Sequence, residues 1–229
     1  MMNIIGHRGA AGLEKENTLA GIKTAIDNGV DGIEFDIHAT KDKNIVLSHD
    51  NNLIRTYSID MNLSTMSIKQ IQRLNKNQET SIPTLEEALN VSGNKIVFIE
   101  GKGGGWARIL AGKIKKYNNP QLCRVISFNH GELFTFGQLC PGIKLYALEN
   151  HNAFNATRAA KTYGFDGIDI NYWTLNPFIY WFCKWKKLDI TVYTVNSRWI
   201  ARFLSILYPN INITTDFPNK LRFITRNKH

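Results

Sequence analysis

Short apolar segments alternate with segments of helical periodicity along this chain, and this alternation constrains the fold more than any other feature. The first unit has a strand at residues 3–5, a helix at 18–28 and a second strand at 30–36. Gly29 is a natural stop for the helix between them. A strand–helix–strand unit of this kind places its two strands parallel in one sheet.

The same alternation continues to the end of the chain. Six further strand candidates lie at 95–100, 124–128, 143–148, 167–170, 191–195 and 211–215. The helix candidates between them are near 105–117, 131–139, 154–163, 177–187 and 197–207, and Thr84 is the expected cap of an earlier helix. With the first two strands the total is eight, the number that closes a TIM (β/α)8 barrel. We therefore predict an α/β fold of this type.

One connection breaks the alternation. Too few residues separate Ile37 from the apolar segment 45–47 for a parallel crossover, so this connection is predicted to be a β-hairpin. If its turn centres on residues 42–43, Asp36 lies opposite His49. The hairpin then returns His49 to the level of the carboxylates on the second strand.

The segment of about 51–81 that follows is polar and irregular, with one short helix candidate at 67–74. We expect a small insertion after the second strand, lying over the face that carries the functional motifs. No internal repeat or low-complexity linker is visible, so residues 1–229 are predicted to form a single domain.

The formal net charge of +9, from 28 Lys+Arg against 19 Asp+Glu, favours anionic partners: phosphate-bearing small molecules, nucleic acid or an acidic membrane surface. A basic, solvated surface without a partner is the alternative. The three cysteines have no CxxC spacing and suggest reduced thiols of a cytosolic protein. The N-terminus leaves no room for a signal peptide, and no apolar stretch is long enough to span a bilayer. A cytoplasmic location is therefore expected.

Acidic side chains occur where predicted strands end. Glu34 and Asp36 flank one apolar residue on a strand, so both carboxylates point to one face. Glu100 ends another strand, and the three together suit a hard divalent cation such as Mg²⁺ or Ca²⁺. The alternative is a set of surface acids, or acids that pair with Arg8 and Lys102.

His7 and His49 each follow an apolar strand and precede a charged residue, Arg8 and Asp50 respectively. Their ordinary pKa near neutrality suits general acid and general base catalysis, and the sequence does not decide which histidine does which. Asp50 either orients His49 or caps the following loop. The remaining histidines lack such neighbours and are interpreted as non-catalytic: His38, His130, His151 and His229.

Two cationic groups, Arg8 and Lys102, are the best placed to bind a phosphate's non-bridging oxygens. Glycines flank Lys102, at Gly101 and at 103–105. This segment is either a phosphate cradle or a flexible turn between strand and helix, and its spacing matches no nucleotide-binding loop.

The helix candidate at 177–187 carries an aromatic stripe: Phe178, Trp181, Phe182 and Trp185. Its other face is also apolar, and three lysines follow. We favour an outer barrel helix that packs this stripe on the sheet. The alternative is an interfacial or oligomeric patch with basic flanks, in which the Phe178–Trp185 helix makes a peripheral membrane contact.

Taken together, these motifs resemble the glycerophosphodiester phosphodiesterase family, in its bacterial cytosolic type. The matching residues are His7-Arg8-Gly9, Glu16-Asn17-Thr18, Glu34-Phe35-Asp36, His49-Asp50, Ile82-Pro83-Thr84-Leu85-Glu86-Glu87, Glu100-Gly101-Lys102, Val192-Tyr193-Thr194-Val195-Asn196 and Thr215-Asp216-Phe217-Pro218. They run in family order over nearly the whole chain.

The resemblance implies a TIM barrel with a small insertion after strand two. It implies a divalent ion, Mg²⁺ or Ca²⁺, on Glu34, Asp36 and Glu100, and acid–base work by His7 and His49. It implies substrate contacts at Arg8, Lys102, Glu16, Asn17 and Tyr193. The family hydrolyses glycerophosphodiesters, such as glycerophosphocholine and glycerophosphoethanolamine, to sn-glycerol 3-phosphate and an alcohol.

Two residues depart from the family pattern. Lys15 stands where the family usually has Pro, which bears on the rigidity of the first loop. Tyr193 stands where it usually has Trp, which alters the pocket wall that meets the glycerol or the alcohol. Neither position is a metal ligand or an acid–base group.

The sequence thus predicts a metal-dependent phosphodiesterase whose nucleophile is water or the substrate's own glycerol hydroxyl, the latter through a cyclic phosphate. One rival is a lipid-acting lysophospholipase D-like or sphingomyelinase D-like enzyme on a similar barrel, supported only by Trp181 and Trp185. Another is a non-catalytic phosphate-binding protein. Nucleic acid is not an expected partner because no recognised binding motif is present. The oligomeric state stays open.

Overall fold

The computed structural model describes residues 2–76 and 81–225 and has the predicted barrel. Its parallel strands are β1 (Asn3–Gly6), β2 (Gly32–Ala39), β4 (Ile96–Gly101), β5 (Cys123–Ser127), β6 (Lys144–Glu149), β7 (Gly167–Asn171), β8 (Asp189–Tyr193) and β9 (Asn212–Thr215). β1 pairs with both β2 and β9, which closes the sheet. The predicted TIM barrel is confirmed, and its strand boundaries agree with the predicted ones within two residues, except that β2 ends three residues later.

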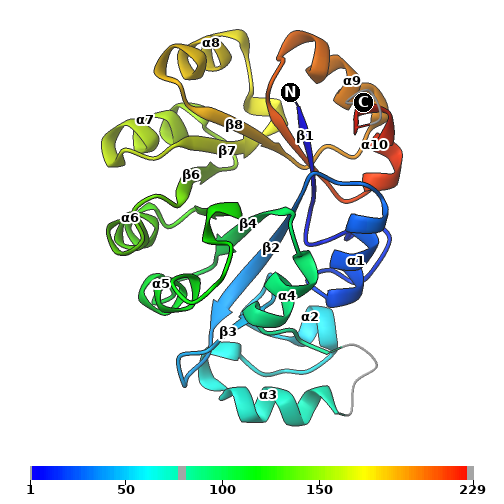
Figure 1. The fold of residues 1–229 in the computed structure, drawn as a ribbon, viewed down its shortest axis with the longest axis vertical. Coiled ribbons are helices and arrows are strands. Elements are labelled where there is room, and N and C mark those ends of the chain that lie inside the picture. The colour runs from blue at the N-terminus through cyan, green and yellow to red at the C-terminus, as the bar shows by residue number, and fades with distance from the viewer. Residues whose placement is uncertain (1, 77–80, 226–229) are drawn as a thin grey trace.

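Helices lie outside these strands in an interrupted ring (Figure 1). They are α1 (Leu19–Asp27), α4 (Leu85–Ser92), α5 (Ala107–Ile114), α6 (His130–Leu139), α7 (Ala153–Tyr163), α8 (Pro177–Lys186), α9 (Arg198–Leu207) and α10 (Pro218–Thr225). Several begin at residues whose side chains cap the helix, as Thr18 does for α1 and Thr84 for α4. Side chains of Ile5, Phe98, Ile126, Tyr146 and Leu148 form a separate apolar cluster inside the barrel, so the interior is a packed core.

The hairpin exists, but its predicted register is wrong by one residue. β3 (Ile45–Leu47) pairs antiparallel with β2 so that Ile37 faces Leu47. Asp36 is therefore level with Ser48, whose N–H donates to the Asp36 carbonyl over 3.2 Å, and not with His49. The loop centres on Asp42 because Lys43 adopts the left-handed conformation at φ 60°, which adds a third residue to the turn.

The insertion forms a small unit beside the barrel, beyond the ends of β2 and β3 (Figure 1). It contains α2 (Ile54–Tyr57), a 3₁₀ turn and α3 (Ile68–Asn75), and residues 77–80 of the predicted segment lie outside the described part. A separate apolar cluster that includes Leu53, Tyr57 and Ile71 stabilises it. It meets the motif-bearing face at its margin, through side-chain contacts of Arg55 described below.

The preferred interpretation of the aromatic stripe on α8 is wrong for three of its four residues: α8 is an outer barrel helix, but only Phe182 of the stripe packs partly against the core. Ile179, Tyr180 and Cys183 are the buried face, whereas Trp181 and Trp185 are 68% and 72% exposed. Both faces of this helix have apolar residues at helical spacing, so periodicity alone could not tell which one packs on the sheet.

All three cysteines are free, and all three are buried. Among the described residues, no helix is both long enough and apolar enough to cross a membrane.

Candidate active site

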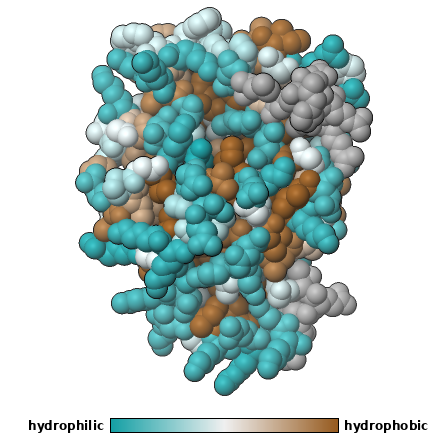
Figure 2. Space-filling view, in the orientation of Figure 1, coloured by the Kyte–Doolittle hydropathy of each residue, from teal (hydrophilic) through white to brown (hydrophobic). Residues whose placement is uncertain are grey.

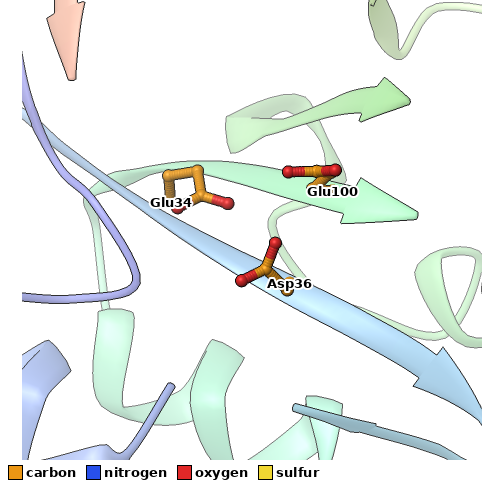
Figure 3. A group of neighbouring side chains, drawn as sticks. All are labelled: Glu34, Asp36 and Glu100. Carbon is orange, nitrogen blue, oxygen red and sulfur yellow. The ribbon is translucent and has the colours of Figure 1, made fainter. Parts of the chain in front are cut away.

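Three carboxylates meet at the carboxyl ends of two adjacent strands (Figure 3). Glu34 and Asp36 lie on β2 and Glu100 on β4, and the parallel register sets Asp36 directly beside Glu100. One oxygen from each lies within 4.8 Å of the others, and all three residues are buried. The predicted carboxylate cluster is thus assembled.

The three carboxyl groups have unequal acidities, because burial raises the pKa of each while the neighbouring cations act most strongly on Asp36. Burial raises the pKa of Glu100 to about 8, and the neighbouring Asp36 adds to the effect. Burial also raises the pKa of Glu34 well above its ordinary value, with Asp36 and Glu100 contributing. For Asp36 burial acts in the same direction, but Lys102 and Arg8 outweigh it and lower the pKa to about 2.

Lys102 contacts the cluster directly. Its Nζ lies 3.0 Å from Asp36 Oδ1 and 2.5 Å from Glu100 Oε1. Glu34 Oε1 is buried and, among the described residues, makes no hydrogen bond. A buried oxygen without a partner is costly unless a cation or donor satisfies it, and oxygen donors from three carboxylates suit a hard divalent ion. The residues present therefore fit such an ion.

His7 is oriented from the last strand of the barrel. Its Nδ1 lies 2.6 Å from Oδ1 of Asp216, and its Nε2 lies 3.9 Å from Glu34 Oε2. Asn196 donates to Asp216 Oδ2 over 2.6 Å and accepts the Asp216 N–H, which fixes that carboxylate. Asp216 has no predicted role from its sequence motif alone. The predicted closure of the barrel could have indicated the contact with His7, because closure places the end of the last strand beside the end of the first strand.

His49 has a matching arrangement. Its Nδ1 lies 2.7 Å from Asp50 Oδ1, so Asp50 orients His49, which was one of its two predicted roles. Arg55 of α2 lies 2.5 Å from Asp50 Oδ2 and also binds Glu16. Burial lowers the pKa of His49; Asp36 opposes the effect, while Lys102 and Arg8 reinforce it.

The loop after β1 positions Arg8 by contacts on three sides. The Arg8 N–H donates to Glu34 Oε2 over 2.8 Å, its Nε lies 3.2 Å from Asp36 Oδ2, and its Nη1 lies 3.0 Å from Glu16. Asn17 is 2% exposed and binds both the Asp36 carboxylate, over 2.8 Å, and the Asp36 N–H, over 3.0 Å. Asn17 and Glu16 therefore contact other site residues through their side chains.

Some of these groups line one pocket of about 120 Å³, whereas Arg8 and Asp36 are not among its lining residues. His7, Glu34, His49, Glu100, Lys102 and Tyr193 are among its lining residues, all of them predicted. The Tyr193 hydroxyl donates to the Glu149 carbonyl over 3.0 Å, which holds the ring in the wall. No residue of the described part of the insertion is among the lining residues.

Asp169 on β7 also lines the pocket, and the sequence analysis assigned it no role. Burial raises its pKa to about 8, so it is largely protonated at neutral pH. Among the other histidines in the described part, His38 and His130 each contact a backbone carbonyl, and neither lines this pocket. His229 lies outside the described residues.

Comparison with known proteins gives a consistent result. Residues 7–220 match the model of the glycerophosphoryl diester phosphodiesterase family. A glycerophosphodiester phosphodiesterase from Caldanaerobacter subterraneus subsp. tengcongensis is 29% identical over 209 residues, which cover 85% of this chain and 86% of that protein.

Solved structures are similar over almost the full chain. A glycerophosphodiester phosphodiesterase from Parabacteroides distasonis has a TM-score of 0.83 at 25% identity, covering 99% of this chain and 98% of that one. A phosphodiesterase from Oleispira antarctica, in complex with the product sn-glycerol-3-phosphate, has a TM-score of 0.83 at 21% identity over 98% of this chain and 96% of that one.

Proposed function

Because the chain belongs to the glycerophosphoryl diester phosphodiesterase family and is an enzyme of that class, we propose that it hydrolyses glycerophosphodiesters with a divalent cation bound by Glu34, Asp36 and Glu100. The products are sn-glycerol 3-phosphate and an alcohol such as choline or ethanolamine. The product bound in the Oleispira antarctica structure supports this substrate class. The observation that carries the proposal is the lining of one pocket by Glu34, Glu100, His7 and His49.

The pocket suits a substrate phosphate. When bound, a Mg²⁺ or Ca²⁺ ion would supply Lewis-acid stabilisation of the phosphoryl charge. Arg8 adds a fixed guanidinium, which Glu16 and Asp36 hold in place, and Lys102 adds an ammonium at the edge of the cluster. Glu16 and Asn17, predicted to touch substrate, are better supported as positioning residues, because their side chains bind Arg8, Arg55 and Asp36.

The two histidines are set up for proton transfer at Nε2. Burial acts to raise the pKa of Asp50 and of Asp216, but hydrogen bonds outweigh it and lower both pKa values. The donors are Arg55 and His49 for Asp50, and His7 for Asp216. Both carboxylates are therefore ionised and can only accept hydrogen bonds. Nδ1 of each histidine therefore carries a hydrogen, and Nε2 is left to exchange a proton with the substrate. The lowered pKa of His49 favours the neutral ring, which is the form that accepts a proton.

We accordingly assign the general base to His49 and the general acid to His7. His49 takes the proton of the nucleophile, which is water or the glycerol hydroxyl that would close a cyclic phosphate. On the second route a water molecule then opens the cyclic phosphate to give sn-glycerol 3-phosphate. His7 gives a proton to the oxygen of the leaving alcohol.

Hydrolysis of glycerophosphocholine tests the activity itself. Chelator should abolish turnover, and added Mg²⁺ or Ca²⁺ should restore it. His7→Ala and His49→Ala should each lose about 10²- to 10⁴-fold in kcat, whereas the exposed His151→Ala should not. Full activity in either of the first two variants would exclude the acid–base assignment.

The leaving group separates the two roles. A p-nitrophenyl ester of glycerol phosphate releases a stable anion that needs no proton. His7→Ala should therefore recover most of its loss on this ester, while His49→Ala should stay impaired on both substrates. The reverse pattern would exchange the roles.

A lipid-acting, lysophospholipase D-like enzyme is the second candidate. The observation that favours it is the exposure of Trp173 and Trp199, at 75% and 78%, just beyond the carboxyl ends of β7 and β8. Lysophosphatidylcholine and glycerophosphocholine, assayed side by side below the micelle concentration, distinguish the two. A higher kcat/KM for the lysolipid would favour this candidate.

A further inference from the structure

Aromatic side chains are exposed on the flank of the barrel formed by α8, α9 and the turn before α8. Four of the five tryptophans lie there, 68–78% exposed, while Trp106 is fully buried. We call the following residues the aromatic flank: Trp173, Phe178, Trp181, Trp185, Trp199, Phe203, Ile206 and Leu207. In Figure 2, pale side chains and a brown group lie at the upper edge, in the part of the view that α8 and α9 occupy in Figure 1; tryptophan is pale on this hydropathy scale.

The two helices are apolar on the side where an outer barrel helix is normally polar. On α9, Ala201 and Leu204 are the buried face, whereas Trp199, Phe203 and Ile206 follow one another at helical spacing on the exposed side. α8 repeats this arrangement with Phe178, Trp181 and Trp185. The helices are adjacent, since the Tyr180 hydroxyl of α8 donates to the Pro209 carbonyl just after α9. Each helix thus exposes several large apolar side chains on its outer side, and exposed apolar area of this kind marks an interaction surface.

The charges of this flank point to an anionic partner. Between residues 172 and 211 the basic residues are Lys184, Lys186, Lys187, Arg198 and Arg202, and the one acidic residue is Asp189. Asp189 accepts from both Lys144 and Tyr146 on β6, which lies on the other side of β7, so it does not neutralise the flank. The Lys186 ammonium lies 3.6 Å from the centre of the Trp185 ring, so basic and aromatic groups are interleaved.

We propose that the aromatic flank docks on an anionic lipid surface. Exposed Trp and Phe with Lys and Arg between them are what an interfacial helix uses: the rings enter the headgroup region and the cations stay with the lipid phosphates. A second copy of this chain fits less well, because a two-fold interface would bring the same basic residues of both copies together.

Docking in this way sets the pocket close to the lipid. Trp173 follows β7 and Trp199 follows β8, so both stand at the same end of the barrel as the carboxylate cluster. The flank therefore begins at the rim of the pocket and runs down the side of the barrel. A phosphodiester produced at a membrane surface would reach the pocket without first diluting into bulk solution.

Co-sedimentation of the full chain with vesicles tests this proposal. Phosphatidylcholine vesicles with added phosphatidylglycerol should bind the protein, and pure phosphatidylcholine vesicles should bind it much more weakly. Rising salt should weaken binding to the anionic vesicles. Binding should also shift tryptophan emission to the blue, since four exposed indoles leave water. Absence of sedimentation with anionic vesicles, or of the shift, overturns the proposal.

Variants distinguish vesicle binding by the aromatic flank from non-specific attraction by the protein's net positive charge. Trp181→Ser combined with Trp199→Ser should weaken vesicle binding by about tenfold or more. Lys186→Glu with Lys187→Glu should do the same, whereas Lys115→Glu with Lys116→Glu, an exposed pair after α5, should not. Ile54→Ser, an exposed apolar position on the insertion, is the matched apolar control. Equal loss in flank and control variants would show non-specific attraction and would contradict docking through this surface.

Two further measurements complete the test. Turnover of soluble glycerophosphocholine should be unchanged in the flank variants, which confirms that they fold, because the aromatic flank does not line the pocket. Analytical ultracentrifugation identifies a second copy as the occupant: a dimer that the Trp181/Trp199 variant dissociates, without vesicle binding by the wild type, overturns the proposal.

Discussion

His7 Nδ1 lies 2.6 Å from Asp216 Oδ1 although the two residues are 209 positions apart. The contact crosses the seam where β1 pairs with β9. It places the imidazole with Nε2 toward Glu34, and it depends on Asn196 to hold the aspartate.

Asp216→Asn should lower kcat by about 10²- to 10⁴-fold, close to the effect of losing the acid–base group itself. The amide can offer its N–H to Nδ1, which would move the ring hydrogen to Nε2, and it removes the charge that stabilises imidazolium. Steady-state kinetics on glycerophosphocholine measure the loss. Thermal unfolding within a few degrees of wild type would show that the fold persists, and kcat at the wild-type level would refute a role for Asp216 in orienting His7.

Metal binding and pH should be linked through Glu100 and Glu34. A raised carboxyl pKa means that the folded, metal-free protein holds protons that the unfolded chain has lost above about pH 4.5. Stability without metal should therefore fall as pH rises from about 4.5 to 8. The lowered pKa of Asp36 adds stability that is already complete above about pH 4, so it does not oppose this trend.

A bound divalent ion would replace those protons, so its affinity should rise over the same pH range. Thermal unfolding with chelator and with excess Mg²⁺ or Ca²⁺, at pH 5.5 and pH 8, measures both effects. The stabilisation by metal should be larger at pH 8. Glu100→Gln should flatten the metal-free pH dependence, and an unaltered profile in that variant would assign the linkage to another group.

Arg55 connects the two halves of the site. It binds Asp50, which orients His49, and Glu16, which holds Arg8. Arg55→Ala should lower kcat roughly tenfold through small displacements of both groups. Because Arg55 is about half exposed, the variant should lose no more than about 1 kcal/mol of unfolding free energy.

Arg73→Ala, an exposed arginine on α3 of the same insertion, is the matched control. It should leave both kcat and stability unchanged. Equal kcat values for the two variants would mean that Arg55 does not position Asp50 and Glu16 for catalysis.

Asn17 should be needed for stability as well as for activity. Asn17→Ala leaves the buried Asp36 N–H and one carboxylate contact unsatisfied, which should cost roughly 2–4 kcal/mol of unfolding free energy. The residue also has φ 56°, where Ala is strained. Asn17→Gly removes that strain and isolates the amide contribution. Denaturant unfolding compares the three proteins, and a glycine variant as stable as wild type would contradict the proposed contribution of the amide.

The local pattern of apolar residues predicted most of the barrel, because each strand and helix has its own spacing of apolar residues and its own terminating residues. The hairpin register was missed since it depends on the backbone angle of Lys43, and a lysine gives no sign that it will take a left-handed conformation. The packed face of α8 was missed because its two faces are equally apolar, and only neighbours distant in the chain select one.

The candidate site likewise contains some residues that the sequence could group and others that it could not. Glu34, Asp36 and Glu100 could be grouped from strand ends alone, since parallel strands carry their ends to one edge. The side-chain contacts of Asn17 and Glu16 could not be, because both residues lie in an irregular loop after β1. Their roles as positioning residues follow only from the three-dimensional contacts.

The seam between β1 and β9 has a consequence for the order in which the enzyme becomes active. β1, β2 and β4, with all three carboxylates, leave the ribosome long before the segment that contains Asp216. A chain paused before β9 can bring those strands together, but His7 then lacks its aspartate. If His7 is the general acid, as proposed, catalytic competence requires the last strand, and turnover by refolding protein should report the final closure of the barrel rather than its early collapse.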